Sequence, residues 1–161
     1  MFRRTLSTRD IAMAGIIAAL YVVLTYIANA MGLASGAIQV RLSEALTILP
    51  CFTGAAIPGL TIGCVVANQV TGCAAMDVAL GSVATLIGTV GTRLLKDKPF
   101  LAWIPPVLSN AVIVPFVLQY AYGLEDAWWY LALTVGAGEV IACGILGLLL
   151  YQSLKRVPHL F

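Results

Sequence analysis

Six apolar segments follow one another along the chain, separated by short stretches that contain turn-forming or charged residues. The segments lie at about 9–30, 43–55, 57–72, 77–96, 103–121 and 127–152. A helix of about 20 apolar residues crosses the hydrocarbon core of a bilayer, so this pattern is typical of transmembrane helices. The second and third segments are short and meet near Gly54 and Pro58, which favour a tight turn. The pattern predicts an all-α integral membrane protein, a compact bundle of six transmembrane helices.

The first segment begins with a helix-capping signal. Ser7 and Asp10 have the spacing of a capping box, in which each side chain satisfies a backbone N–H group of the other residue. The apolar run that follows is longer than the core of a usual signal peptide. We therefore expect a retained helix that begins near Thr8, in a single membrane domain over 1–161 with an outer loop at about 31–42.

Composition agrees with a membrane protein. Hydrophobic residues make up 61% of the 161 residues and charged residues 10%, whereas a typical soluble domain carries roughly 25% charged residues. Four scattered cysteines, Cys51, Cys64, Cys73 and Cys143, form no C-x-x-C pair, and one histidine, His159, stands near the end. We therefore predict neither a metal site nor a disulfide framework, and no nucleic-acid partner.

Basic residues indicate how the helices are oriented. With six spans, eight of the nine basic residues fall on one side: Arg3, Arg4, Arg9, Arg93, Lys96, Lys98, Lys155 and Arg156. Basic residues are enriched in cytoplasmic loops, so this side and both termini are predicted to be cytoplasmic. The ninth, Arg41, falls in the expected outer loop.

A few polar residues interrupt the apolar segments, most of them toward the outer side. Such groups are costly in hydrocarbon and usually face a protein interior or a cavity. They predict a cavity open to the outside, lined by Arg41, Glu44, Asn68, Gln69, Asp77, Asn110, Gln119 and Glu139. Glu139, flanked by Gly136 and Gly138, either contacts a polar ligand or is neutralised by protonation or by Arg41.

The stretch AIQVRLS alternates apolar and polar residues, which favours an extended segment with one polar face. Ser43 then fits the N-cap of the next helix, with Glu44 near its positive end. Arg41 and Glu44 either neutralise each other at this helix start or belong to a lid over the outer cavity.

Several long motifs resemble the QueT family over about residues 7–152. They are AIQVRLSEALT, AAIPGLTIGCVVAN, DVALGSVATLIGT, PPVLSNAVIVP and GAGEVIACGILG, together with the small pair Ala14 and Ala18 in the first segment. The resemblance implies the substrate-binding subunit of an energy-coupling factor (ECF) importer in the bacterial plasma membrane. Such a subunit binds a queuosine precursor, a 7-deazaguanine base with an aminomethyl or cyano group, and delivers it inward. The implied partners are two ATPase subunits and a membrane scaffold subunit that Ala14 and Ala18 would meet.

A deazaguanine ligand gives the predicted polar residues a chemical use. Its N–H and amine groups match a carboxylate such as Glu139 or Glu44, and a cationic aminomethyl group would suit a second carboxylate. Asp77 is also counted among the predicted ligand-binding residues. Donors to its carbonyl oxygen would come from Gln39, Arg41, Asn68 or Asn110. Aromatic stacking on the ring would come from Tyr21, Tyr26, Trp128 or Trp129.

No phosphate-binding G-x-x-x-x-G-K-[ST] motif occurs in the chain, so ATP would be used by the partner subunits and no cofactor is expected here. The chain also lacks a recognisable nucleophile–base pair, so an enzyme is not expected. The alternatives left open are a binding subunit for another small nutrient, such as a vitamin, and, more remotely, a small intramembrane enzyme using Glu139 or Asp77 as acid or base.

Overall fold

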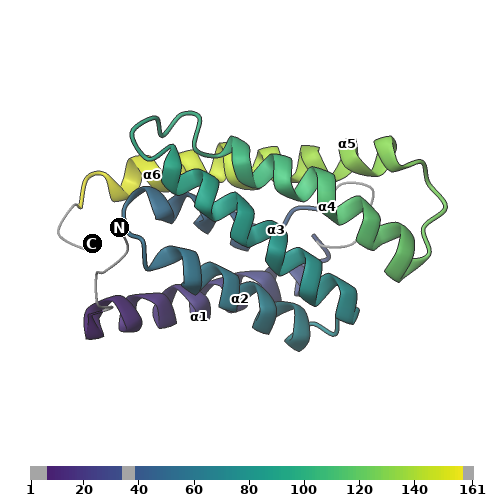
Figure 1. The fold of residues 1–161 in the computed structure, drawn as a ribbon, viewed down its shortest axis with the longest axis horizontal. Helices are drawn as coiled ribbons and strands as arrows, with labels where there is room; N and C mark the ends of the chain where they lie inside the picture. Colours follow the sequence, from purple (N-terminus) through teal and green to yellow (C-terminus); the bar gives the residue numbers. More distant parts are fainter. Residues whose placement is uncertain (1–6, 34–38, 158–161) are drawn as a thin grey trace.

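The computed structural model describes residues 7–33 and 39–157, and the described residues form a bundle of helices without strands (Figure 1). The α-helices are α1 (Thr8–Ala30), α2 (Ala56–Val70), α3 (Ala75–Leu94), α4 (Ile104–Tyr122), α5 (Trp128–Glu139) and α6 (Gly147–Leu154). A 3-10 helix, η1 (Leu42–Cys51), precedes α2. A π-helical stretch, η2 (Val140–Leu146), joins α5 and α6 into one continuous helix.

Each predicted apolar segment corresponds to a helix whose ends lie within a few residues of the expected ones, so the prediction of an all-helical fold is confirmed for the described residues. Four helices are long and apolar enough to cross a membrane, namely α1, α3, α4 and the continuous helix Trp128–Leu154. The helices η1 and α2 are apolar but shorter. Six membrane spans and cytoplasmic termini therefore stay predictions.

The capping box predicted at the first helix is present, and α1 begins at Thr8. Asp10 N–H donates to Ser7 Oγ over 3.2 Å, and Ser7 N–H donates to Asp10 Oδ2 over 3.1 Å. The predicted N-cap at Ser43 is wrong, because η1 already begins at Leu42. Ser43 is buried in the interior of η1, where its hydroxyl accepts a hydrogen bond from Thr25 in α1.

The short helix η1 lies at the centre of the bundle, in contact with α1, α2, α3, α6 and η2. Pro50, which has no backbone N–H to donate, stands one residue before its end. The carbonyl of Pro50 accepts a 2.8 Å hydrogen bond from Arg93 of α3. Apolar residues of η1 pack with α1 and α2 in the main core, which contains Ile17, Tyr21, Leu46, Leu49, Ala56, Leu60, Cys64 and Ala67. The helix η1 is therefore packed inside the protein from its first turn onward.

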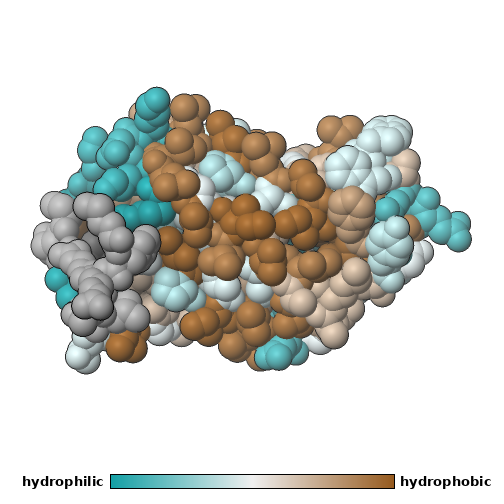
Figure 2. All heavy atoms as spheres, in the orientation of Figure 1, coloured by the Kyte–Doolittle hydropathy of each residue, from teal (hydrophilic) through white to brown (hydrophobic). Residues whose placement is uncertain are grey.

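The surface is divided along the long axis of the bundle. On the face shown in Figure 2, hydrophobic residues cover most of the middle and polar residues gather toward both ends. The start of α1, the connection between α3 and α4, and the end of α6 lie together at one end (Figure 1). These parts carry the described basic residues other than Arg41, namely Arg9, Arg93, Lys96, Lys98, Lys155 and Arg156. This surface fits a membrane-embedded bundle with one basic face.

Replacing Gly88 with Ala is expected to destabilise the contact between α3 and α4. A Cβ atom at Gly88 would lie 2.6 Å from the Cα of Pro106, a backbone atom at the rigid start of α4. Overpacking of this kind costs about 1 to 3 kcal/mol, so the midpoint of thermal unfolding in detergent should fall by several degrees. Gly15→Ala is the matched control, because a Cβ there meets nothing within 4 Å. Equal midpoints of thermal unfolding for Gly88→Ala and Gly15→Ala would contradict the close α3–α4 packing.

Candidate functional site

A cavity of about 430 Å³ lies at the end of the bundle opposite to the basic residues. Its walls come from the ends of α1, α2 and α4, the start of α3 and the segment before η1. The lining residues are Thr25, Ala28, Asn29, Gln39, Arg41, Asn68, Thr71, Cys73, Asp77, Val114, Leu118, Tyr122 and Leu124. Apolar walls with a few polar groups are typical of small-molecule sites.

Asp77, in the first turn of α3, is the best-connected polar residue of this cavity. Its Oδ2 atom lies 3.6 Å from Nη2 of Arg41 and accepts a 3.0 Å hydrogen bond from the hydroxyl of Tyr122. The amide of Asn68 donates to its backbone carbonyl over 3.3 Å. Its other carboxylate oxygen, Oδ1, is buried and has no hydrogen-bond partner among the described residues. The cavity is therefore lined by a carboxylate that Arg41 and Tyr122 contact and that has one oxygen without a described hydrogen-bond partner.

Glu139, at the end of α5, borders a gap of about 10 Å³, about the least space that can hold one water molecule. The gap is also lined by Gln39, Arg41, Asn110, Val114 and Val135. Gln39, Arg41 and Val114 border the main cavity as well. Glu139 therefore stands directly behind Gln39 and Arg41 as seen from that cavity.

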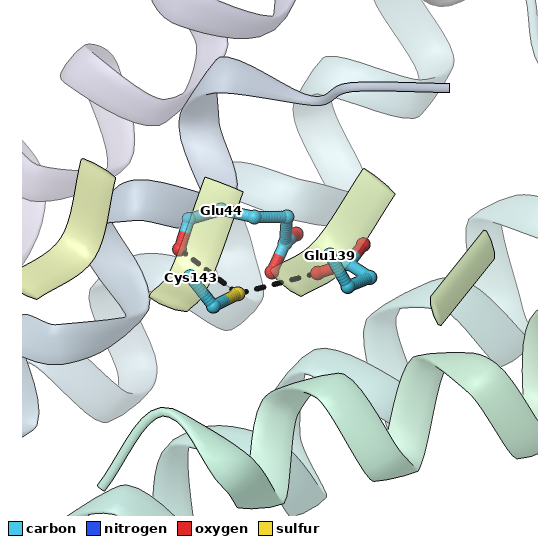
Figure 3. A group of neighbouring side chains, drawn as sticks. All are labelled: Glu44, Glu139 and Cys143. Atoms are coloured by element: carbon cyan, nitrogen blue, oxygen red, sulfur yellow. Dashed lines mark hydrogen bonds between the residues drawn. The ribbon is translucent and has the colours of Figure 1, made fainter. Parts of the chain in front are cut away.

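Glu44, on η1, and Glu139, at the end of α5, point toward each other (Figure 3). The hydroxyl of Tyr21 donates to Oε1 of Glu44, while Oε2 has no hydrogen-bond partner among the described residues. Sγ of Cys143 lies 3.2 Å from Oε2 of Glu139 and 3.5 Å from the carbonyl oxygen of Glu44. Cys143 stands on the π-helical stretch η2, and such stretches often occur at functional sites.

Glu44, Glu139 and Cys143 are also the described residues that come closest to a metal-ligand set. Each offers one ligand atom, and these atoms lie within 4.8 Å of one another. Zinc accepts carboxylate and thiolate ligands, but its structural sites use four of them. The prediction of no metal site is therefore best tested at this cluster.

The segment before η1 is held tightly against α5. A Cβ atom at Gly138 would overlap the carbonyl oxygen of Gln39 and would lie 2.9 Å from its carbonyl carbon. Val40 N–H donates to the carbonyl of Leu33 over 2.9 Å. Arg41 has an extended backbone, as the alternating pattern suggested. Positions 34–38 of the predicted outer loop lie outside the described residues, so the lid hypothesis applies here only to Gln39, Val40 and Arg41.

The seven predicted ligand-binding residues fall into three connected places. Gln39, Arg41, Asn68 and Asp77 line the main cavity, Asn110 and Glu139 border the small gap, and Glu44 lies beside Glu139. The ion pair that Arg41 forms among the described residues is with Asp77, so neither of the alternative pairings considered for it, with Glu44 or with Glu139, is present as an ion pair there.

Two of the other polar residues expected at the cavity, Gln69 and Gln119, line none of the described cavities. Gln69 is exposed, and Gln119 donates to the backbone of Asp126.

The aromatic residues considered for ring stacking also lie elsewhere. Tyr21 is buried beside Glu44, Tyr26 and Trp129 are exposed, and Trp128 packs on Phe116 with 5.7 Å between ring centroids. The aromatic residue that lines the main cavity is Tyr122, which the sequence analysis did not single out. Its position at the end of an apolar segment resembled an ordinary interface anchor.

Ala14 and Ala18, the small pair of α1, pack against α2 and are also partly exposed at the surface of the protein. Cβ atoms at Gly59 and Gly63 of α2 would come within 3.1 Å of the Cα atoms of Ala14 and Ala18, respectively. Both alanines are half-buried, whereas their neighbours Gly15 and Ala19 are exposed. The backbone of this part of α1 is therefore packed on α2, and its outward small residues are Gly15 and Ala19.

Comparison with known proteins gives a family and one curated relative. A family model described as QueT transporter matches residues 11–156. A Lactococcus lactis subsp. cremoris protein named "Queuosine precursor transporter QueT" is 38% identical over 91 residues, 56% of this chain and 53% of that protein. The match thus spans about half the length of this curated relative. No solved structure matches the chain.

Proposed function

Because this chain belongs to the QueT transporter family, we propose that it is a membrane subunit that binds a queuosine precursor from outside and delivers it inward. The name of the curated relative supports a queuosine precursor as the ligand. The proposed precursor is a 7-deazaguanine base with an aminomethyl or a cyano group. The observation that carries this proposal is the cavity in which the carboxylate of Asp77 lies beside Arg41 and Asn68, with one oxygen unpartnered among the described residues. The membrane would be the bacterial plasma membrane.

The cavity has the size and chemistry that such a base requires. Its volume of about 430 Å³ falls within the range of about 300 to 1,000 Å³ found for small-molecule pockets. The ring N–H and the exocyclic amine would donate to Asp77, and Arg41, Asn68 or Gln39 would donate to the ring carbonyl. Apolar Val114, Leu118 and Leu124 would cover the ring faces. Asn110, Glu139 and Glu44 would contact the part of the ligand that lies farthest from Asp77.

The chain would work with a membrane scaffold subunit and two ATPase subunits of the ECF type. Since the sequence contains no phosphate-binding loop, ATP hydrolysis would take place in these partners. The surface of α1 around Ala14 and Ala18 would meet the scaffold. Because Gly15 and Ala19 are the outward small residues there, a partner helix could approach the α1 backbone most closely along them.

Replacing Gly15 and Ala19 together with Leu is expected to reduce uptake by the assembled transporter at least tenfold while leaving ligand binding by the isolated subunit unchanged. The bulky side chains would block a close helix approach, but neither residue lines a described cavity. Uptake would be measured in cells that co-express the scaffold and ATPase subunits. Ala79→Leu, at another exposed small residue, is the control. Wild-type uptake by the double variant would contradict this docking surface.

The proposed ligand can be tested by the mass of the small molecule that stays bound during purification in detergent. We expect the mass of an aminomethyl- or cyano-substituted deazaguanine. A vitamin would select the alternative of a subunit for another nutrient. A chemically altered product would favour an intramembrane enzyme and contradict the proposed function.

A further inference from the structure

The carboxylates beside the cavity outnumber the cations. Asp77, Glu44 and Glu139 are 4%, 2% and 6% exposed, and Arg41 is the one basic side chain that the described residues place near them. The ion pair of Arg41 is formed with Asp77 at 3.6 Å. The other described basic residues lie at the opposite end of the bundle. Neither Glu44 nor Glu139 thus forms an ion pair with a described basic residue, although Arg41 borders the gap beside Glu139.

The geometry of this pair leaves room for a donor. Oε2 of Glu44 has no hydrogen-bond partner among the described residues, although its side chain is almost completely buried. Figure 3 shows the carboxylate of Glu44 pointing toward that of Glu139, with Cys143 beside both. Buried carboxylates are stable when they are paired with a cation or when they bind a proton or a metal ion. A primary ammonium carries three N–H donors and could satisfy oxygens of both acids at once.

We propose that Glu44 and Glu139 form an inner subsite that receives a primary ammonium group of the bound molecule. The inference rests on the proposed function and sharpens it: the preferred precursor is the deazaguanine with a cationic aminomethyl group, and the neutral cyano compound is disfavoured. The base itself lies in the main cavity against Asp77, and its aminomethyl arm points inward.

The cavity and the acid pair are connected along the segment before η1. Gln39 and Arg41 border both the main cavity and the small gap at Glu139. An aminomethyl arm has one carbon and one nitrogen outside the ring, so it requires the gap of about 10 Å³ to widen when the ligand binds, by movement of the Gln39 side chain. Arg41 is paired with Asp77 and also borders the gap at Glu139. In the proposed complex one ligand spans the main cavity and this gap.

The test is equilibrium binding of two probes, 7-aminomethyl-7-deazaguanine and 7-cyano-7-deazaguanine, to the purified full-length protein in detergent. Wild-type protein is expected to bind the aminomethyl compound at least tenfold more tightly. In Glu44→Gln and Glu139→Gln this preference should fall toward one, while affinity for the cyano compound changes less than threefold. Glu125→Gln is the control, because Glu125 is an exposed acid that lines none of the described cavities.

Equal affinity of the wild-type protein for the two probes would overturn the inference, even if neither variant folds. So would a tenfold preference that persists in both variants. One equivalent of zinc in the purified wild-type protein that Glu44→Gln removes would assign the cluster to a metal ion and also overturn it. Binding of neither probe would instead refute the proposed function, and the inference would fall with it.

Discussion

Asp77→Asn should weaken binding of 7-aminomethyl-7-deazaguanine by about 10- to 100-fold. The substitution removes the negative charge of the Asp77 carboxylate and leaves Arg41 without its ion-pair partner. A hydrogen bond to a charged group contributes about 1.5 to 3 kcal/mol, and a tenfold change in affinity corresponds to about 1.4 kcal/mol. Because Asp77 contacts the base and not its substituent, the affinity for the cyano compound should fall by a similar factor. Calorimetric titration of the purified variant measures both.

Tyr122→Phe is the control for Asp77→Asn. It removes the 3.0 Å hydrogen bond to Oδ2 but leaves the charge, Oδ1 and Arg41 in place. Its effect on ligand affinity should be smaller than that of Asp77→Asn, because the lost bond joins two protein groups and the charged carboxylate stays paired with Arg41. Wild-type affinity in a folded Asp77→Asn variant would contradict the role of Asp77 in the cavity.

Gly138→Ala is expected to abolish detectable ligand binding or to reduce affinity more than tenfold. The added Cβ would overlap the carbonyl oxygen of Gln39, a backbone atom that cannot rotate away. The segment carrying Gln39 and Arg41 would have to move, and overpacking of this kind costs about 1 to 3 kcal/mol. Arg41 would then lose its position beside Asp77. The measurement is again equilibrium binding, with thermal unfolding to separate lost binding from lost folding.

Gly136→Ala is the matched control for Gly138→Ala on the same helix, two residues earlier in the chain. A Cβ atom there would lie 3.7 Å from the Cβ of Ala111, which is an ordinary van der Waals contact. We expect wild-type binding and equal or slightly higher stability, because Ala is a better helix former than Gly. If Gly138→Ala bound ligand as well as Gly136→Ala, the close contact between α5 and Gln39 would be wrong.

The helices could be predicted from the sequence because local signals determine them. Ser7 and Asp10 mark the start of α1, and the apolar segments match the helices closely. Of the polar residues from separate segments that were expected to gather around a cavity, Arg41, Asn68 and Asp77 line the main one. Polar side chains in apolar helices are driven together, because hydrocarbon offers them no hydrogen-bond partners.

The partners of individual side chains depend on tertiary packing and could not be predicted. Arg41 and Glu44 are three positions apart, yet Arg41 pairs with Asp77 of α3 and Glu44 bonds to Tyr21 of α1. The start of η1 at Leu42 moves Ser43 inward to Thr25, against its cap propensity. No local pattern indicated the π-helical stretch after Glu139 or the contact of Gly138 with Gln39. The π-helical stretch and the contact of Gly138 with Gln39 are the features that bring Glu44 and Glu139 together.

The central claim is that the cavity beside Asp77 holds a deazaguanine base, and an experimental structure with bound 7-aminomethyl-7-deazaguanine tests it most directly. We predict density for the base between Arg41, Asn68 and Asp77, with ring N–H or amine groups within hydrogen-bond distance of Asp77 Oδ1. Density for the ligand elsewhere on the protein, with this cavity filled only by solvent, would contradict the account.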